Sequence, residues 1–146
     1  MADYVIETIN TGLNPTYFAY NPSNKDLYVN AASSTILVIN STSDVVKSIL
    51  VGESPRELIY NPANDDMYVP NHDSDTVSVI DSSTNTVIKT IPVVEDPWWI
   101  IYNPSNKYMY VANREGGTIT VLSPLDIISK PDFDDTLKPT SSKNIR

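Results

Sequence analysis

The side chains best suited to catalysis or metal binding gather around residue 72. His72, the single histidine of the chain, stands in the segment Asn71-His72-Asp73-Ser74-Asp75. A serine, histidine and aspartate triad would have to include it, and the two aspartates offer the hard oxygen ligands that calcium prefers. The flanking residues do not follow the EF-hand pattern. We therefore favour a solvated polar turn and predict no catalytic residues, no metal and no cofactor.

Two other positions carry groups suited to ligand recognition. Arg56, followed by Glu57, can clamp a carboxylate or a phosphate, and Trp98 can stack on a sugar or an aromatic ring. The competing interpretation is an internal ion pair and a hydrophobic plug, and we favour it. The predicted ligand site, with the polar loop residues added, is Arg56, Asn71, His72, Asp73, Trp98, Asn113 and Arg114.

These candidates lie in a sequence that repeats about every 40 residues. The segment NPSNKDLYV at 21–29 recurs as NPANDDMYV at 61–69 and as NPSNKYMYV at 103–111. Such a period is typical of propeller blades or of helical solenoids. Short runs of Val, Ile, Tyr and Thr, separated by Asn, Pro, Ser and Asp, favour strands, and no window offers ten helical residues. Each unit is therefore predicted to be a four-stranded antiparallel meander.

The repeated residues predict local structure as well. In the Asn-Pro-x-Asn turn, proline suits the second position of a type I turn, and asparagine suits a left-handed position. Asn24, Asn64 and Asn106 are expected to fill that position. Tyr28, Tyr68 and Tyr110 recur at one place in every unit, which indicates packing between blades rather than an aromatic binding array.

Several of these segments resemble the YVTN family of β-propeller repeats. They are YVPN at 68–71, YVAN at 110–113, TVSVID at 76–81 and TVIKTI at 86–91. The resemblance implies propeller blades with adhesion, assembly or ligand-binding roles. Because the family is best known from surface-layer and secreted proteins, it also implies an extracellular or surface location, although the start of the sequence lacks the features of a signal peptide.

The repeat boundaries predict an incomplete propeller. Residues 1–123 divide into an outer strand at 4–11, blades at 13–52 and 55–94, and a partial blade at 97–123. The outer strand has no blade of its own, and the partial blade has no outer strand.

Closing the ring requires more than three blades. We predict a two-fold dimer that forms one six-bladed propeller, through strand exchange between residues 4–11 and 118–122. The alternative is a part of a longer six- or seven-bladed protein. Residues 124–146 are predicted to be a proline-containing tail, with Leu125, Ile127, Ile128, Phe133 and Leu137 as its docking anchors.

Charge and composition narrow the functional classes. The net charge is −8, and the sequence has no run of about 18 apolar residues that would cross a membrane. This acidity disfavours nucleic acid and anionic membrane surfaces as partners. We predict a non-catalytic scaffold that binds a protein or a glycan, and the alternative is a lactonase-like or lyase-like propeller enzyme with a site at the channel mouth.

Overall fold

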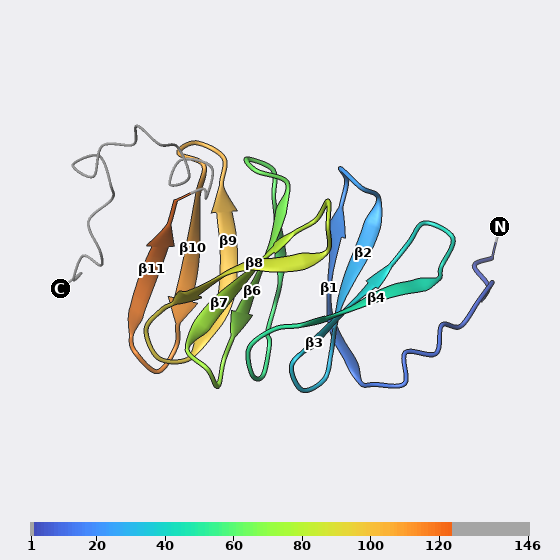
Figure 1. Ribbon diagram of the computed structural model, residues 1–146, viewed down its shortest axis with the longest axis horizontal. Coiled ribbons are helices and arrows are strands. Elements are labelled where there is room, and N and C mark those ends of the chain that lie inside the picture. The colour runs from blue at the N-terminus through green and yellow to red at the C-terminus, as the bar shows by residue number, and fades with distance from the viewer. Residues whose placement is uncertain (1, 124–146) are drawn as a thin grey trace.

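The computed structural model describes residues 2–123, and all of its regular structure there is β-strand (Figure 1). Three antiparallel sheets follow one another: blade 1 (β1-β2-β3-β4), blade 2 (β5-β6-β7-β8) and blade 3 (β9-β10-β11). The strands are β1 (Pro15–Asn21), β2 (Asp26–Ala31), β3 (Thr35–Ile39), β4 (Val45–Leu50), β5 (Ile59–Asn61), β6 (Asp66–Asn71), β7 (Thr76–Asp81), β8 (Thr86–Pro92), β9 (Pro97–Asn103), β10 (Tyr108–Asn113) and β11 (Thr118–Leu122). The all-β prediction is confirmed. No helical segment within residues 2–123 has the length and apolar character needed to span a bilayer.

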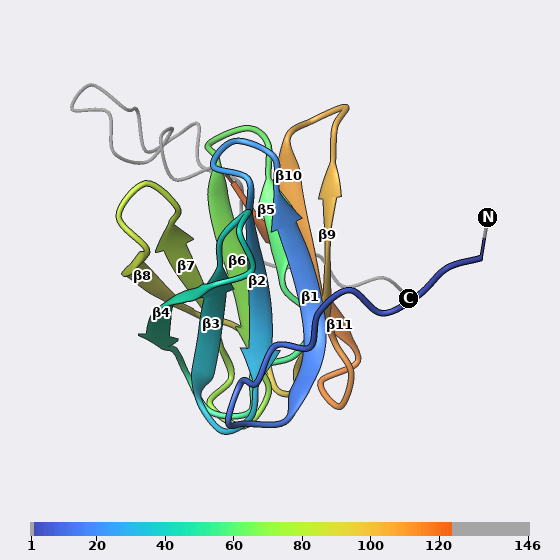
Figure 2. The same ribbon diagram turned by 90° about the vertical axis from the view of Figure 1, so that its right-hand side faces the viewer.

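The hydrophobic core lies between the blades, because alternate residues of a strand point to opposite faces of its sheet. One buried cluster joins Tyr28 of blade 1 to Met67 of blade 2, and a second joins Tyr68 of blade 2 to Met109 of blade 3. The blades therefore stack face to face in chain order (Figure 1). Figure 2 looks onto the face of blade 1 that points away from blade 2.

The three repeated tyrosines differ in burial. Tyr28 and Tyr68 are completely buried at the two contacts between blades, as predicted. Tyr110 holds the same place in blade 3 but is only half-buried, so the prediction is wrong for this residue. The reason is that no blade follows blade 3 in the part of the chain that the structure describes.

The first turn of each blade also corrects a prediction. The left-handed residues stand one position after the asparagines: they are Lys25, Asp65 and Lys107, with φ of 65°, 64° and 63°. Asn24 acts through its side chain instead, because its Oδ1 accepts a backbone amide at 2.9 Å and its Nδ2 donates to the Tyr28 hydroxyl at 3.0 Å. Asn64 and Asn106 donate to their own tyrosines in the same way. The turn therefore needs asparagine for its hydrogen bonds.

Blade 2 has a short inner strand, and Pro70 explains it. β5 has three residues, whereas β1 and β9 have seven. Pro70 stands in β6, where blade 1 has Asn30 and blade 3 has Ala112. Proline has no N–H to donate to a neighbouring strand, which weakens the pairing there. The backbone N–H of Arg56 still donates to the Pro70 carbonyl at 2.8 Å, so Arg56 is fixed just outside the strand.

The sequence predicts an outer strand near the start of the chain and a docked tail at its end. Residues 4–11 form no strand in the single chain, because β11, the edge without a fourth strand, lies at the opposite end of the molecule (Figure 1). Tyr4, Val5 and Ile6 are 79%, 81% and 86% exposed. The predicted tail at 124–146 lies outside the described residues.

Candidate functional site

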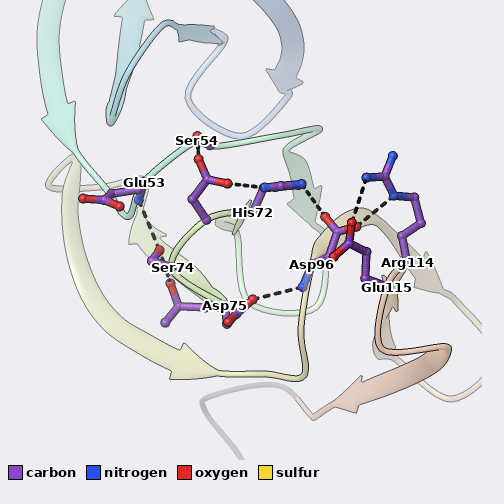
Figure 3. A network of polar contacts seen from close by, with 10 residues as sticks. Glu53, Ser54, His72, Ser74, Asp75, Asp96, Arg114 and Glu115 are labelled. Atoms are coloured by element: carbon purple, nitrogen blue, oxygen red, sulfur yellow. Dashed lines mark hydrogen bonds and ion pairs between the residues drawn. The ribbon is translucent and has the colours of Figure 1, made fainter.

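Most of the predicted ligand residues meet at one end of the sheets, which we call the loop face; Figure 3 shows His72 and Arg114 there, with their polar contacts. It consists of residues 52–57, 72–75, 94–98 and 114–117. Backbone hydrogen bonds fix its loops: His72 N donates to Ser54 O at 3.0 Å, and Arg114 N donates to Asp96 O at 2.9 Å. Ser54 and Asp96 both have left-handed backbones, with φ of 51° and 61°. In blades 2 and 3, the turn between the second and the third strand is thus held by the connection that enters the first strand of the same blade.

His72 links the second blade to the connection before the third. Its Nδ1 lies 2.5 Å from Asp73 Oδ1, and its Nε2 lies 2.5 Å from Asp96 Oδ1. The contact with Asp73 is a hydrogen bond, whereas Asp96 Oδ1 is buried without a hydrogen-bond partner, so the contact of His72 with Asp96 is a close approach of two oppositely polarised groups. Both ring nitrogens of His72 therefore face carboxylates of the protein itself.

Asp96 is the centre of this network. Its side chain is 4% exposed, its Oδ2 accepts from Arg114 Nε at 2.8 Å, and its backbone N–H donates to Asp75 Oδ1 at 3.0 Å. A buried carboxylate is costly unless it is paired with charge and hydrogen-bonded. The contacts with His72 and Arg114 supply that pairing, and they hold the turn of blade 2 against blade 3.

Trp98 lies in the middle of the cluster. The guanidinium carbons of Arg56 and Arg114 lie 4.2 Å and 4.1 Å from the centre of its ring, which is the geometry of a cation–π contact. The His72 ring meets it edge-on, with centres 5.2 Å apart and planes at 76°. The structure thus brings together five of the seven predicted residues: Arg56, His72, Asp73, Trp98 and Arg114.

Arg56 differs from Arg114 in lacking a carboxylate partner. Arg114 pairs with Asp96, whereas Arg56 forms no ion pair with Glu57 or with any other acid among residues 2–123. Its Nε is buried without a hydrogen-bond acceptor. The internal ion pair favoured from the sequence is therefore absent from the described residues. The Arg56 guanidinium forms no salt bridge there, and its charge acts on Asp73 only over a longer distance.

Asn71 and Asn113 lie inside the blades. Asn71 Nδ2 donates to Thr76 Oγ1 at 3.0 Å and to Ser78 Oγ at 2.9 Å, so it clamps β6 to β7. Asn113 makes the equivalent bonds to two threonines of β11. Both asparagines are buried, and this arrangement gives them a role in the hairpins.

The two aspartates that follow His72, Asp73 and Asp75, accept hydrogen bonds from different parts of the loop face. Asp73 accepts from the Ser54 hydroxyl, and this bond, together with the contact to His72, holds the pKa of Asp73 below its usual value. Asp75 points instead to the backbone of Asp96. Within residues 2–123, no group of three or more His, Asp or Glu side chains is arranged to hold a metal ion.

Asp96 was not singled out in the sequence, although a signal for it is present. A small polar residue precedes each repeated proline, namely Asn14, Ser54 and Asp96. Such residues favour turns because their side chains accept nearby backbone amides. The repeat therefore marks a turn residue at this position, but it does not indicate that one of the three would collect a histidine and an arginine.

A second surface of interest is the outer face of blade 3, which we call the blade 3 flank. It consists of Trp99, Ile101, Tyr110, Ala112, Ile119 and Val121, and it lines most of an apolar hollow of about 470 Å³. Ile119 and Val121 are 53% and 41% exposed, whereas the equivalent Ile36 and Val38 of blade 1 are completely buried. Large exposed apolar patches mark interaction surfaces.

Comparison with known proteins supports the propeller architecture. A family model described as YNCE-like beta-propeller matches residues 15–127. No curated protein matches the sequence significantly. Hydrazine synthase from Kuenenia stuttgartiensis is 27% identical, with a TM-score of 0.71, over 85% of this chain and 37% of that one.

Two other solved structures are similar in fold. AztD from Citrobacter koseri is 17% identical with a TM-score of 0.63, over 84% of this chain and 35% of that one. A proposed 6-phosphogluconolactonase from Bacteroides fragilis is 18% identical with a TM-score of 0.65, over 79% and 36%. At these identities the likeness shows the fold alone. The chain spans little more than a third of each of these structures.

Proposed function

Because the chain belongs to the YNCE-like beta-propeller family, we propose that it is a non-catalytic assembly and binding module that completes a propeller ring with a second copy of itself. The narrower YVTN assignment and a surface location stay predictions from the repeat motifs. The proposal has two parts: assembly through the blade 3 flank, and ligand binding at the loop face.

The contrast between equivalent residues supports assembly. Blades 1 and 2 each bury one face against the following blade, and their tyrosines there have no exposed surface. In the blade 3 flank, Tyr110, Ile119 and Val121 match Tyr28, Ile36 and Val38 of blade 1 in type and position, and Ile119 is half exposed. The two internal contacts thus indicate what fits this surface, which is the face of another blade.

A second copy offers a blade face to fill it. The outer face of blade 1 has a buried centre at Val29 and Leu37, while Phe18, Tyr20 and Leu50 are 60%, 56% and 77% exposed on the same side. Docking this face on the blade 3 flank of a partner, twice, gives a ring of six blades. Closed propellers have about four to eight blades. A trimer would have nine.

Light scattering after size exclusion tests the assembly. The expected mass is twice the chain mass of 16.2 kDa. Ile119→Glu should yield the monomer, because each dimer buries two copies of this side chain; at about 2 kcal/mol each, the dissociation constant should rise about a thousandfold. Ile88→Glu is the matched control, since Ile88 is 50% exposed on the outer strand of blade 2. A monomeric wild-type protein would contradict the proposal.

The loop face is the proposed binding surface, with Arg56 as its anchor. Its guanidinium forms no salt bridge with an acid among the described residues and is oriented by Trp98. A planar guanidinium suits a carboxylate, which it engages through two parallel hydrogen bonds. The ligand expected here is a carboxylate group of a protein or glycan partner.

The enzyme alternative depends on His72. A lactonase-like or lyase-like reaction would use this imidazole, the single one in the sequence, as a proton acceptor or donor. Both of its nitrogens instead lie 2.5 Å from carboxylates that hold two blades together. This engagement favours binding over catalysis.

A further inference from the structure

We propose that residues 5–10 of one copy form the missing fourth strand of blade 3 in the other copy, in a single defined register. The proposal rests on the proposed dimer and goes beyond it, because a dimer held by apolar faces alone needs no exchanged strand. It concerns the free edge of β11, which is separate from the blade 3 flank.

The missing strand is evident from the other two blades. Blades 1 and 2 end in an outer strand, β4 or β8, that pairs with the third strand of the blade. In blade 3, β11 pairs only with β10, so one of its edges keeps unpaired N–H and C=O groups within the described residues. Free strand edges of this kind are templates for pairing with another chain.

Residues 5–12 have the sequence of an outer strand. The segment VIETINTG at 5–12 aligns without gaps with VVKSILVG at 45–52, which contains β4. In both segments a charged residue stands third, a hydroxyl residue fourth and isoleucine fifth. A segment with this pattern gains its backbone hydrogen bonds only when a strand lies beside it.

The internal pairing fixes the register of the exchanged strand. In blade 1, Ile49 lies opposite Ile36 and Lys47 opposite Val38. In blade 2, Ile91 and Lys89 lie opposite the equivalent valines of β7. By the same alignment, Ile9 should lie opposite Ile119, and Glu7 opposite Val121. In both outer strands the residue just before the lysine is skipped in the pairing, so Val5 is expected opposite Leu122.

This register gives Ile9 an apolar environment. Its counterpart Ile49 is 4% exposed in a core cluster, and its counterpart Ile91 packs against another. Ile9 is 36% exposed in the single chain. Beside Ile119 it would extend the blade 3 flank and cover its outer border.

The strand must come from another copy. Residues 2–14 leave from blade 1, and β11 lies in blade 3 at the other end of the described molecule (Figures 1 and 2). The same arrangement, repeated by the two-fold axis, uses both outer segments and leaves neither β11 edge open.

Cysteine cross-linking tests the register, because the sequence has no cysteine of its own. Glu7→Cys protein is mixed with Val121→Cys protein under mild oxidation, so that a disulfide between the two positions must join two chains. Directly opposed residues of paired strands are close enough for a disulfide. The matched control pairs Glu7→Cys with Thr120→Cys, whose side chain points to the opposite face of the sheet. We expect a reducible species of twice the chain mass from the first pair and only background from the control.

The outcomes separate this proposal from the dimer itself. A mixture that is dimeric by light scattering but does not cross-link selectively would overturn the strand exchange and leave the apolar docking intact. Equal cross-linking in both pairs would overturn the register. A Glu7→Cys, Val121→Cys double variant that cross-links within a monomer would show that the strand returns to its own chain. A monomeric protein would overturn both proposals.

Discussion

Removing one hydroxyl from each of two equivalent tyrosines should have unequal effects on stability. Tyr28→Phe removes a phenol that is completely buried, donates to Asn85 Oδ1 of the neighbouring blade and accepts from Asn24 Nδ2 at 3.0 Å. Burial also raises the pKa of Tyr28, so the hydroxyl stays protonated and able to donate. Tyr110→Phe removes a half-buried phenol whose hydroxyl accepts from Asn106 at 2.7 Å.

The structure sets the expected magnitudes. Without the Tyr28 hydroxyl, Asn85 loses its donor at a partly buried contact, while Asn24 keeps the Ser82 carbonyl at 3.1 Å. Leaving a fully buried polar group unpaired costs about 1–3 kcal/mol, and because Asn85 is only partly buried we expect a loss of about 1 kcal/mol in unfolding free energy. Tyr110→Phe affects a group near solvent and should stay within about 0.5 kcal/mol.

Urea denaturation followed by tryptophan fluorescence measures both effects. Both variants are made in the Ile119→Glu background, so that assembly does not contribute to stability. With the slope usual for a small protein, Tyr28→Phe should lower the urea midpoint by about 0.5 M. Equal losses for the two variants, or a larger loss for Tyr110→Phe, would refute the claim that the neighbouring blade makes this contact.

Two further predictions concern titration and binding. The hydrogen bond from Tyr60 to Asp65 raises the pKa of Tyr60 from an ordinary 10.0 to about 12. The contribution of this bond to stability is therefore complete below pH 10 and disappears as the pH rises through 12. In Asp65→Asn, an absorbance titration should show the pKa of one phenol returning toward 10.0, and an unchanged titration would contradict this. Citrate, used as a carboxylate probe, should raise the thermal midpoint of the wild-type protein and of the control Lys89→Gln but not that of Arg56→Gln, and equal shifts in all three would argue against Arg56 as the anchor.

The fold was predictable because its signals are local and repeated. The Asn-Pro turns and the Tyr-Val strands recur with one spacing, and each copy reinforces the assignment of the others. The error at Asn24 had a physical cause: asparagine suits both a left-handed backbone and a side-chain cap, and only coordinates separate the two roles. The short β5 follows from proline chemistry, because Pro70 has no N–H to donate to the neighbouring strand.

Most residues of the loop face could be identified from the sequence, but the contacts between them could not. Arg56, Trp98 and Arg114 stood out because they vary where the repeat is otherwise constant. Their partners depend on distances across blades. Asp96 and Ser54 both stand just before a repeated proline, yet their contacts differ. Asp96 contacts His72 and Arg114, whereas the Ser54 hydroxyl donates to Asp73. A local pattern cannot distinguish them, because the difference lies in which residues the neighbouring turn presents.

The blade 3 flank shows the limit of sequence reasoning most clearly. Tyr110, Ile119 and Val121 match Tyr28, Ile36 and Val38 in type and spacing, so their sequence predicts a buried face. The structure agrees for blade 1 and differs for blade 3, since burial of a face depends on the surface that follows it. A strand whose sequence has the pattern of a buried strand but whose face is exposed thus indicates a surface that a partner would cover. The two contacts between blades within this chain show the shape and chemistry expected of that partner.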